Sequence, residues 1–421
     1  MVLAYCLFEG SSTSLVLIQN GKDSAQIFNF IRFLLATHYF CKMSAKKRRP
    51  PHHHLAYKYF KRLQADKPLP EDEYHILNEK ELARIKKVKV RATLQAGLCG
   101  AIAVLTYYIP LLLFPDFFAG FLSKFKLFGY DLEFNFLTFG FNILLVLIEV
   151  YLLTRINIWA VAETANASGF PDRRDPDYEQ HVEQLFTVGL DSPDKQTLEF
   201  GIDPYEGTPK FYILLFTVFN LIKATLTNFV VKMITVKILA RSGLRQYADL
   251  MGVPVFFIWN AFATWRIIEA AKIYIMAPGL IKEMGTKVSA LHDDEDVRQN
   301  IYDAMQYIVT VKRSFHHNHF LLVKELIDVF ELNDFKDKES DREAFLSKIK
   351  ASKPEVKMAY SKLIVMGILI DGDISRREVK AMNYLYEEGI MNIEPSMAKV
   401  WCRDFRDGKG LDALINCEAE S

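Results

Sequence analysis

The sequence predicts an all-α protein in which a four-segment transmembrane helical bundle precedes a soluble all-α C-terminal domain. Three observations predict this class. Half of the 421 residues are hydrophobic, the longest apolar runs lie in the middle of the chain, and amphipathic runs with helical spacing follow residue 281. The formal net charge of +1 indicates that nucleic acid is not the partner.

The transmembrane region is expected over residues 93–281, with spans at about 93–114, 134–154, 212–231 and 251–275. The first segment has no charged residue, and its 22 residues reach about 33 Å at ~1.5 Å per residue, enough to cross a hydrocarbon core of roughly 30 Å. Lys223 lies at the centre of the third segment, and the fourth ends in Arg266 and Glu269. Because the loop between segments three and four contains Lys237, Arg241 and Arg245, we expect these segments either to span fully or to form a re-entrant hairpin that keeps this loop inside.

The region before the first span divides at Met43. Residues 1–42 lack the basic start and cleavage site of a signal peptide, and we interpret them as a doubtful N-terminal extension. Residues 43–92 are expected to form a basic cytoplasmic helical region, with a helix starting at Pro70. Residues 44–91 contain 14 Lys or Arg and 6 acids, whereas the loop after the first span contains two lysines. The positive-inside rule therefore places the N-terminus in the cytoplasm, and four crossings return the C-terminus to it.

Four ionisable residues fall within the expected bundle: Glu149, Lys223, Arg266 and Glu269. Such residues either line a path for an ion or small solute or pair with one another. The pairing interpretation is favoured, with Glu149 bonded to Arg266 and Glu269 bonded to Lys272. The sequence shows no repeat and no selectivity-filter motif that would favour transport.

The expected C-terminal domain, residues 282–421, contains helical runs at 297–312, 317–330, 342–349, 357–370 and 375–387, and the second loop, 155–210, is expected to be long, polar and cytoplasmic. The stretch MGILIDGDISRREVKAM, residues 366–382, has the acids of a calcium loop. A calcium loop would, however, need oxygen ligands at two positions that are Gly367 and Leu369. We expect instead a helix that ends at Ile370, followed by a tight turn.

In this turn Gly372 permits the tight backbone, Ile374 fills the core, and Ser375 caps the next helix in a capping box with Glu378. Asp371 and Asp373 are then exposed turn acids or, as the alternative, ligands of a weakly bound divalent ion. No firm metal site is predicted.

Other candidate sites are few. His316 and His319 lie one helical turn apart and act either as surface or capping residues or as two metal ligands. The five cysteines show no CxxC pairing, and none of the common nucleotide-binding, metalloprotease or serine-hydrolase motifs occurs. We expect no cofactor and no enzymatic activity.

Asp371, Gly372, Ile374 and Glu378 follow an apolar helix, and in this pattern the segment resembles the helix-turn-helix signature of the TerB-like domains associated with tellurite resistance. The stretches GIDPYEGTPKF and VPVFFIWNAFATWR are similar to those of uncharacterised bacterial multi-spanning membrane proteins that carry such a tail. The resemblance covers about a quarter of the tail. A second Asp-Gly turn is usual in that family, and the stretch LNDFKDKESDREAF is a degenerate candidate for it.

This resemblance implies a multi-pass protein of the bacterial inner membrane. The expected function is to anchor a cytoplasmic helical interaction module in the lipid bilayer, with a cytoplasmic protein as partner, in envelope or metal-stress response. The alternative is a transporter or channel for a small solute or ion.

Overall fold

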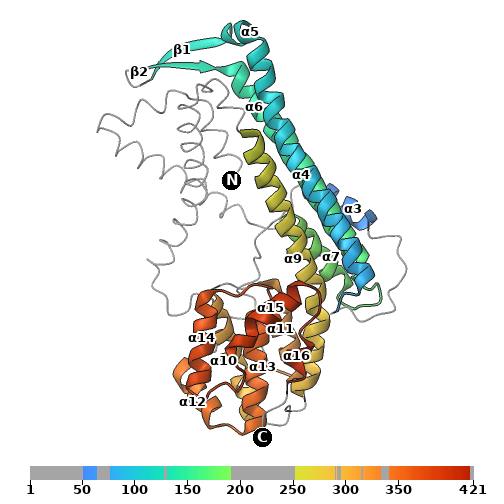
Figure 1. The fold of residues 1–421 in the computed structure, drawn as a ribbon, viewed down its shortest axis with the longest axis vertical. Helices are drawn as coiled ribbons and strands as arrows, with labels where there is room; N and C mark the ends of the chain where they lie inside the picture. The colour runs from blue at the N-terminus through green and yellow to red at the C-terminus, as the bar shows by residue number, and fades with distance from the viewer. Residues whose placement is uncertain are drawn as a thin grey trace. The chain divides into compact units, whose positions relative to one another are not determined.

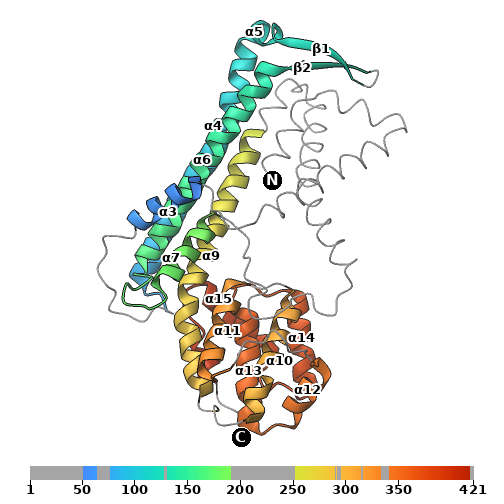
Figure 2. The same cartoon turned by 180° about the vertical axis from the view of Figure 1, so that it is seen from behind.

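The computed structural model describes residues 51–63, 76–127, 130–190, 252–289, 291, 295–313, 316–332 and 341–417. Figures 1 and 2 show them from opposite sides. Their regular secondary structure is helical apart from one β-hairpin. Two expected segments, the extension 1–42 and the third span with Lys223, lie outside the described residues.

The chain divides into two compact units, which are treated separately below. Of the described residues, the first unit contains 51–60, 94–127, 130–156 and 252–261. The second contains 61–63, 76–93, 157–190 and everything described from residue 262 onward. Three long helices, α4 (Glu79–Leu113), α6 (Phe136–Ala167) and α9 (Gly252–Ser289), each contribute residues to both units.

Helices α4 and α6 are long and apolar enough to cross a membrane, judged by length and composition. Only 22% of the apolar window of α4 and 6% of that of α6 is buried. Both helices extend beyond the expected spans. Helix α4 starts after Asn78, which forms a reciprocal cap with Glu81, so the expected start at Pro70 is wrong. Helix α6 continues to Ala167, so the first part of the expected polar loop is helical.

The connection between α4 and α6 contains the short helix α5 (Pro115–Ala119) and a hairpin of β1 (Leu122–Leu127) and β2 (Tyr130–Asn135). The strands pair antiparallel, from Leu122 opposite Asn135 to Leu127 opposite Tyr130. The all-α class holds for the described residues apart from this hairpin, which the sequence did not predict. In β2 the sequence YDLEFN alternates apolar and polar residues, the pattern of a strand with two different faces.

The remaining helices are α3 (Pro51–Leu63), α7 (Tyr178–Gly189), α10 (Glu295–Lys312), α11 (His317–Val329), α12 (Arg342–Ala351), α13 (Pro354–Leu369), α14 (Arg376–Glu387), α15 (Pro395–Arg406) and α16 (Asp412–Ile415). Helix α13 is the central helix of the second unit, and it packs against α10, α12, α15 and α16. The helices expected between residues 297 and 387 are confirmed as α10 to α14. Helices α15 and α16 were not predicted, and neither was α7, which lies inside the expected polar loop.

The second half of α9 is part of the core of the second unit. Tyr274 is fully buried; its hydroxyl lies 2.8 Å from Nδ1 of His181, and its ring centroid lies 5.2 Å from that of His317. Ile273 is buried against the turn at Gly372. The expected domain boundary at residue 282 therefore falls inside a continuous helix and is wrong, because apolar residues before it pack into the C-terminal helices.

Candidate functional site

The turn between α13 and α14 has the geometry predicted for it. The Ser375 side chain accepts a hydrogen bond from the backbone N–H of Glu378, and the Glu378 carboxylate accepts one from the backbone N–H of Ser375 at 2.8 Å, which confirms the capping box. Gly372 has φ of +73°, and a Cβ at this position would lie 2.7 Å from Cδ1 of Ile273. Glycine is therefore required here both by backbone conformation and by the close approach of α9.

A lysine ammonium organises the acids of this turn. Lys312, at the end of α10, has a side chain that is 3% exposed, and its Nζ lies 2.8 Å from both carboxylate oxygens of Asp371. The same Nζ donates to the carbonyl oxygens of Ile368 at 2.8 Å and Asp373 at 3.0 Å, and it lies 3.5 Å from Oε2 of Glu378. The turn thus surrounds a buried cation with carboxylate and carbonyl oxygens.

Side chains of α11 satisfy further carbonyls at the end of α13. Asn318 donates to the carbonyl of Ile370 at 2.7 Å, and Nε2 of His319 lies 2.8 Å from the carbonyl oxygen of Gly367. Nδ1 of His319 accepts from the backbone N–H of His316, so His319 is the neutral tautomer that carries its proton on Nε2. Burial lowers the pKa of His319 to about 4, which keeps the ring neutral at physiological pH.

The histidine pair is confirmed as a capping arrangement, because His316 and His319 form the capping box of α11. Two details of the predicted turn are wrong. Asp371 is not an exposed acid, since its side chain is 14% exposed and ion-paired, and Ile374 is only half-buried. Among the described residues no group of three or more His, Cys, Asp and Glu could hold a metal ion. The Lys312 ammonium takes the place that a divalent cation would need.

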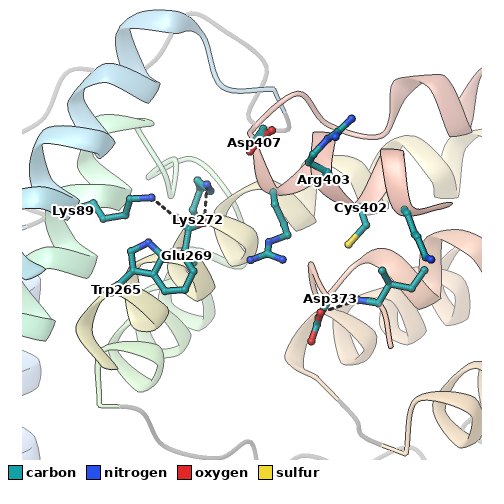
Figure 3. Close-up of a pocket in the computed structure, with 11 residues that line it drawn as sticks. Lys89, Trp265, Glu269, Lys272, Asp373, Cys402, Arg403 and Asp407 are labelled. Carbon is teal, nitrogen blue, oxygen red and sulfur yellow. Dashed lines mark hydrogen bonds and ion pairs between the residues drawn. The ribbon is translucent and has the colours of Figure 1, made fainter. Parts of the chain in front are cut away.

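Beside this turn lies a cleft of about 400 Å³, which Figure 3 shows in close-up. It is lined by Lys89, Trp265, Glu269, Lys272, Asp373, Ile374, Lys399, Cys402, Arg403, Arg406 and Asp407. On one side Glu269 accepts from Lys89 at 2.6 Å and from Lys272 at 2.8 Å, which confirms the predicted pair with Lys272. The Lys89 Nζ also lies 5.7 Å from the ring centroid of Trp265.

The cleft is cationic, with five basic and three acidic side chains in its lining. No acid of the described residues forms an ion pair with Lys399, Arg403 or Arg406, whereas Glu269 is shared by two lysines. Cys402, in the same wall, is not an activated nucleophile, because burial is the main cause that raises the pKa of its thiol to about 11. The cleft therefore suits the binding of an anionic group better than covalent catalysis.

The polar residues predicted within the bundle that the structure describes belong to both units. In the first unit Glu149 accepts a hydrogen bond from Asn260 at 2.7 Å. Glu269 belongs to the cleft of the second unit, and Arg266 is exposed there. The expected pair between Glu149 and Arg266 joins residues of the two units and stays a prediction.

The most informative residues were missed by the sequence analysis. Lys312 is 59 positions from Asp371, and Lys89 is 180 positions from Glu269. One signal was present for Lys312: three acids lie between residues 371 and 378 in a segment that follows a buried helix, and buried acids need a compensating cation. Sequence spacing alone does not say which of the 52 basic residues supplies it.

Fold and site together define a predominantly helical protein with two candidate membrane-spanning helices and a C-terminal helical region built around a lysine-centred turn. Comparisons with protein-family models, curated proteins and solved structures gave no match.

Proposed function

We propose that this protein is an integral protein of the bacterial inner membrane that anchors a cytoplasmic helical interaction module with a TerB-like C-terminal part. In this proposal α4, α6, the segment 212–231 and the first half of α9 form a four-segment bundle. The module acts by binding a cytoplasmic protein, in envelope or metal-stress response. The observation that carries the proposal is the exposed apolar surface of α4 and α6.

Exposed large apolar side chains recur along the apolar segments of both helices. On α6, Leu144 is 54% exposed and Leu147 is 62% exposed, and on α4, Ile102 is 58% exposed. The core helix of a soluble protein would bury such side chains, each at a gain of about 1.5–3 kcal/mol. Exposed apolar surface of this kind is typical of contact with lipid or with another protein. Two exposed helices of spanning length favour lipid.

Within each unit, basic side chains contact aromatic rings near the ends of the apolar segments. In the second unit the guanidinium carbon of Arg91 lies 5.0 Å from the ring centroid of Trp159, and Lys89 lies over Trp265. In the first unit Arg155 lies 5.7 Å from the ring centroid of Tyr59. Aromatic rings with Lys and Arg are typical of the cytoplasmic boundary of a span, which supports a cytoplasmic C-terminal region.

The role in metal stress is proposed to be indirect. Because the acidic turn encloses Lys312, it offers no open cation site, and a response to metal would have to reach the module through its partner. The cationic cleft of Figure 3 is a surface on which such a partner could place an acidic group.

Topology mapping with full-length reporter fusions tests the proposal. A periplasm-active reporter inserted at residues 128–129, in the hairpin between β1 and β2, should be active, and the same reporter after Ser421 should be inactive. A cytoplasm-active reporter should show the reverse. The protein should also stay with the membrane pellet after alkaline carbonate extraction. Recovery in the soluble fraction, or equal reporter activity at both sites, would contradict the proposal.

A further inference from the structure

A second cationic groove, which shares no lining residue with the cleft, lies among α10, α12 and α14, which are labelled in Figures 1 and 2. Its volume is about 300 Å³, and it is lined by Thr310, Val311, Arg342, Arg377, Lys380, Ala381 and Tyr384. We name it the arginine groove. Three of these seven residues are basic and none is acidic. The groove lining therefore carries only positive charge, whereas the cleft lining contains both basic and acidic side chains.

In the part of the chain that the structure describes, the cations of the arginine groove have no acidic partner. No described acidic side chain forms an ion pair with Arg342, Arg377 or Lys380. Arg342 is flanked by the exposed Glu343 and by Asp341, whose carboxylate caps α12 by accepting from the backbone N–H groups of Glu343 and Ala344. Glu378, next to Arg377, is buried, bonded to the Ser375 backbone and close to Lys312. Its charge is therefore committed to the neighbouring turn.

Like charges crowd at Arg377. The pKa of its guanidinium lies below the usual value, first because of burial and then because of the positive charges of Arg313 and Arg342. Arg377 is the second residue of α14 and Arg342 the first of α12, and helix N-termini disfavour cations. The folded protein thus maintains a cluster of positive charge that destabilises it when the groove is empty, a cost typical of binding sites.

The guanidinium groups are held in place. Arg377 donates from Nη2 to the carbonyl of Thr310 at 3.3 Å, and the Arg342 guanidinium carbon lies 5.2 Å from the ring centroid of the buried Tyr307. Each guanidinium has five N–H donors, so most remain available after these contacts. Tyr384, 48% exposed, adds a hydroxyl at the groove. Fixed guanidinium forks match tetrahedral phosphate oxygens in geometry and charge.

We propose that the arginine groove binds the dianionic phosphate of a phosphate monoester. The inference rests on the interaction role proposed above and gives the chemistry of the recognised group. Phosphorylated side chains and small phosphate esters carry the same group, so both are candidate sources. The groove is lined mainly by exposed side chains, which suits a group presented from outside.

Binding is tested by calorimetry on the full-length protein in a neutral maltoside detergent and phosphate-free buffer. The probes are phenyl phosphate, a phosphoserine pentapeptide, its unphosphorylated form and sulfate. Binding of either monoester, with no binding of the unphosphorylated peptide, supports the proposal, and the tighter monoester identifies the source. If neither monoester binds at millimolar concentration, or if sulfate binds at least as tightly as both, the proposal is overturned.

Two variants test whether the monoester binds in the arginine groove. Arg377→Gln and Arg342→Gln should each weaken monoester binding at least tenfold, because each removes a charged fork. Arg376→Gln is the matched control, since Arg376 is the exposed neighbour on α14 and does not line the groove. The thermal midpoint of the ligand-free protein should be unchanged or raised in the groove variants, because like-charge repulsion is relieved. Equal affinities in all three variants would overturn the assignment, and so would loss of binding in Arg376→Gln alone.

Discussion

Lys312 replaces, with a side chain of the protein itself, the cation that the acids of residues 371–378 require. Its ammonium contacts Asp371 and two backbone carbonyls at 2.8–3.0 Å, and Glu378 lies at 3.5 Å. Removing one partner of a buried ion pair leaves an uncompensated charge, which is costlier than losing the attraction alone. This arrangement explains why the turn has the acids of a calcium loop. It also explains why two of the calcium ligands, at the positions of Gly367 and Leu369, are missing.

The variant Lys312→Met tests this role. It keeps the aliphatic stem but leaves Asp371 without its counter-charge, and we expect the free energy of unfolding to fall by about 3–5 kcal/mol. The measurement is thermal unfolding of the full-length protein in detergent, followed by near-ultraviolet circular dichroism. The matched control is Lys409→Met, whose side chain is 67% exposed and pairs with Asp404, and it should change stability by less than about 1 kcal/mol.

A second substitution separates charge from packing. Adding Asp371→Asn to Lys312→Met should recover part of the lost stability, because the isolated carboxylate is then neutral. A Lys312→Met protein as stable as the wild type would show that the ammonium does not hold the turn together.

Helix α4 packs against α9 at two glycines. A Cβ at Gly97 would lie 2.8 Å from the Phe257 ring, and a Cβ at Gly100 would lie 2.9 Å from the Phe256 carbonyl oxygen and would also meet Asn260. Asn260 in turn donates to Glu149 of α6. Small residues allow close helix approach in bundles that lack a hydrophobic drive between helices. In the first unit the three helices are therefore joined by the two glycine contacts and by the hydrogen bond from Asn260 to Glu149.

We expect Gly100→Val to weaken the packing of α4 on α9 and to lower the thermal midpoint in detergent by several degrees, because the neighbouring backbone cannot move aside. Gly140 on α6 provides the matched control, since a Cβ there meets nothing within 4 Å. Gly140→Val should leave the midpoint nearly unchanged. Equal effects of both substitutions would mean that the contact at Gly100 does not stabilise the helices.

Features that depend on neighbouring residues were predictable, and features that depend on distant ones were not. The cap formed by Ser375 and Glu378 involves three positions of separation, and the helix ends follow from local hydrogen bonding. The hairpin was missed because only its second strand alternates, and β1, with the sequence LSKFKL, does not. The expected ends at residues 154 and 275 failed because apolar residues continue past them into buried helix, whereas α4 extends before residue 93 through a charged segment.

At the scale of the whole molecule, the C-terminal helices are incomplete without α9. Ile268, Tyr274 and Met276 are all fully buried, and they precede the boundary at residue 282 that the sequence suggested. The cleft also depends on distant parts of the chain, since Lys89 lies on α4, Glu269 on α9 and Arg403 on α15. Such a site could not be assembled from spacing along the chain.

A fragment of residues 282–417 should therefore behave as a molten globule. It lacks the residues of α9 that cover α11 and the turn at Gly372, so apolar surface would be exposed. We expect strong binding of a hydrophobic dye and little near-ultraviolet circular dichroism. A fragment of residues 262–417 restores the second half of α9 and should bind less dye. Sharp cooperative unfolding of the shorter fragment would show that α9 is dispensable.

Because the cation at the centre of the turn is the Lys312 ammonium, the turn does not depend on the concentration of free metal ions. A mineral ion leaves its ligands when its free concentration drops, but a group attached to the same polypeptide stays at a constant, high local concentration. Chelators, or swings in calcium and magnesium, should therefore leave the junction of α13 and α14 intact. The turn would thus keep its architecture while loosely held ions around it are exchanged.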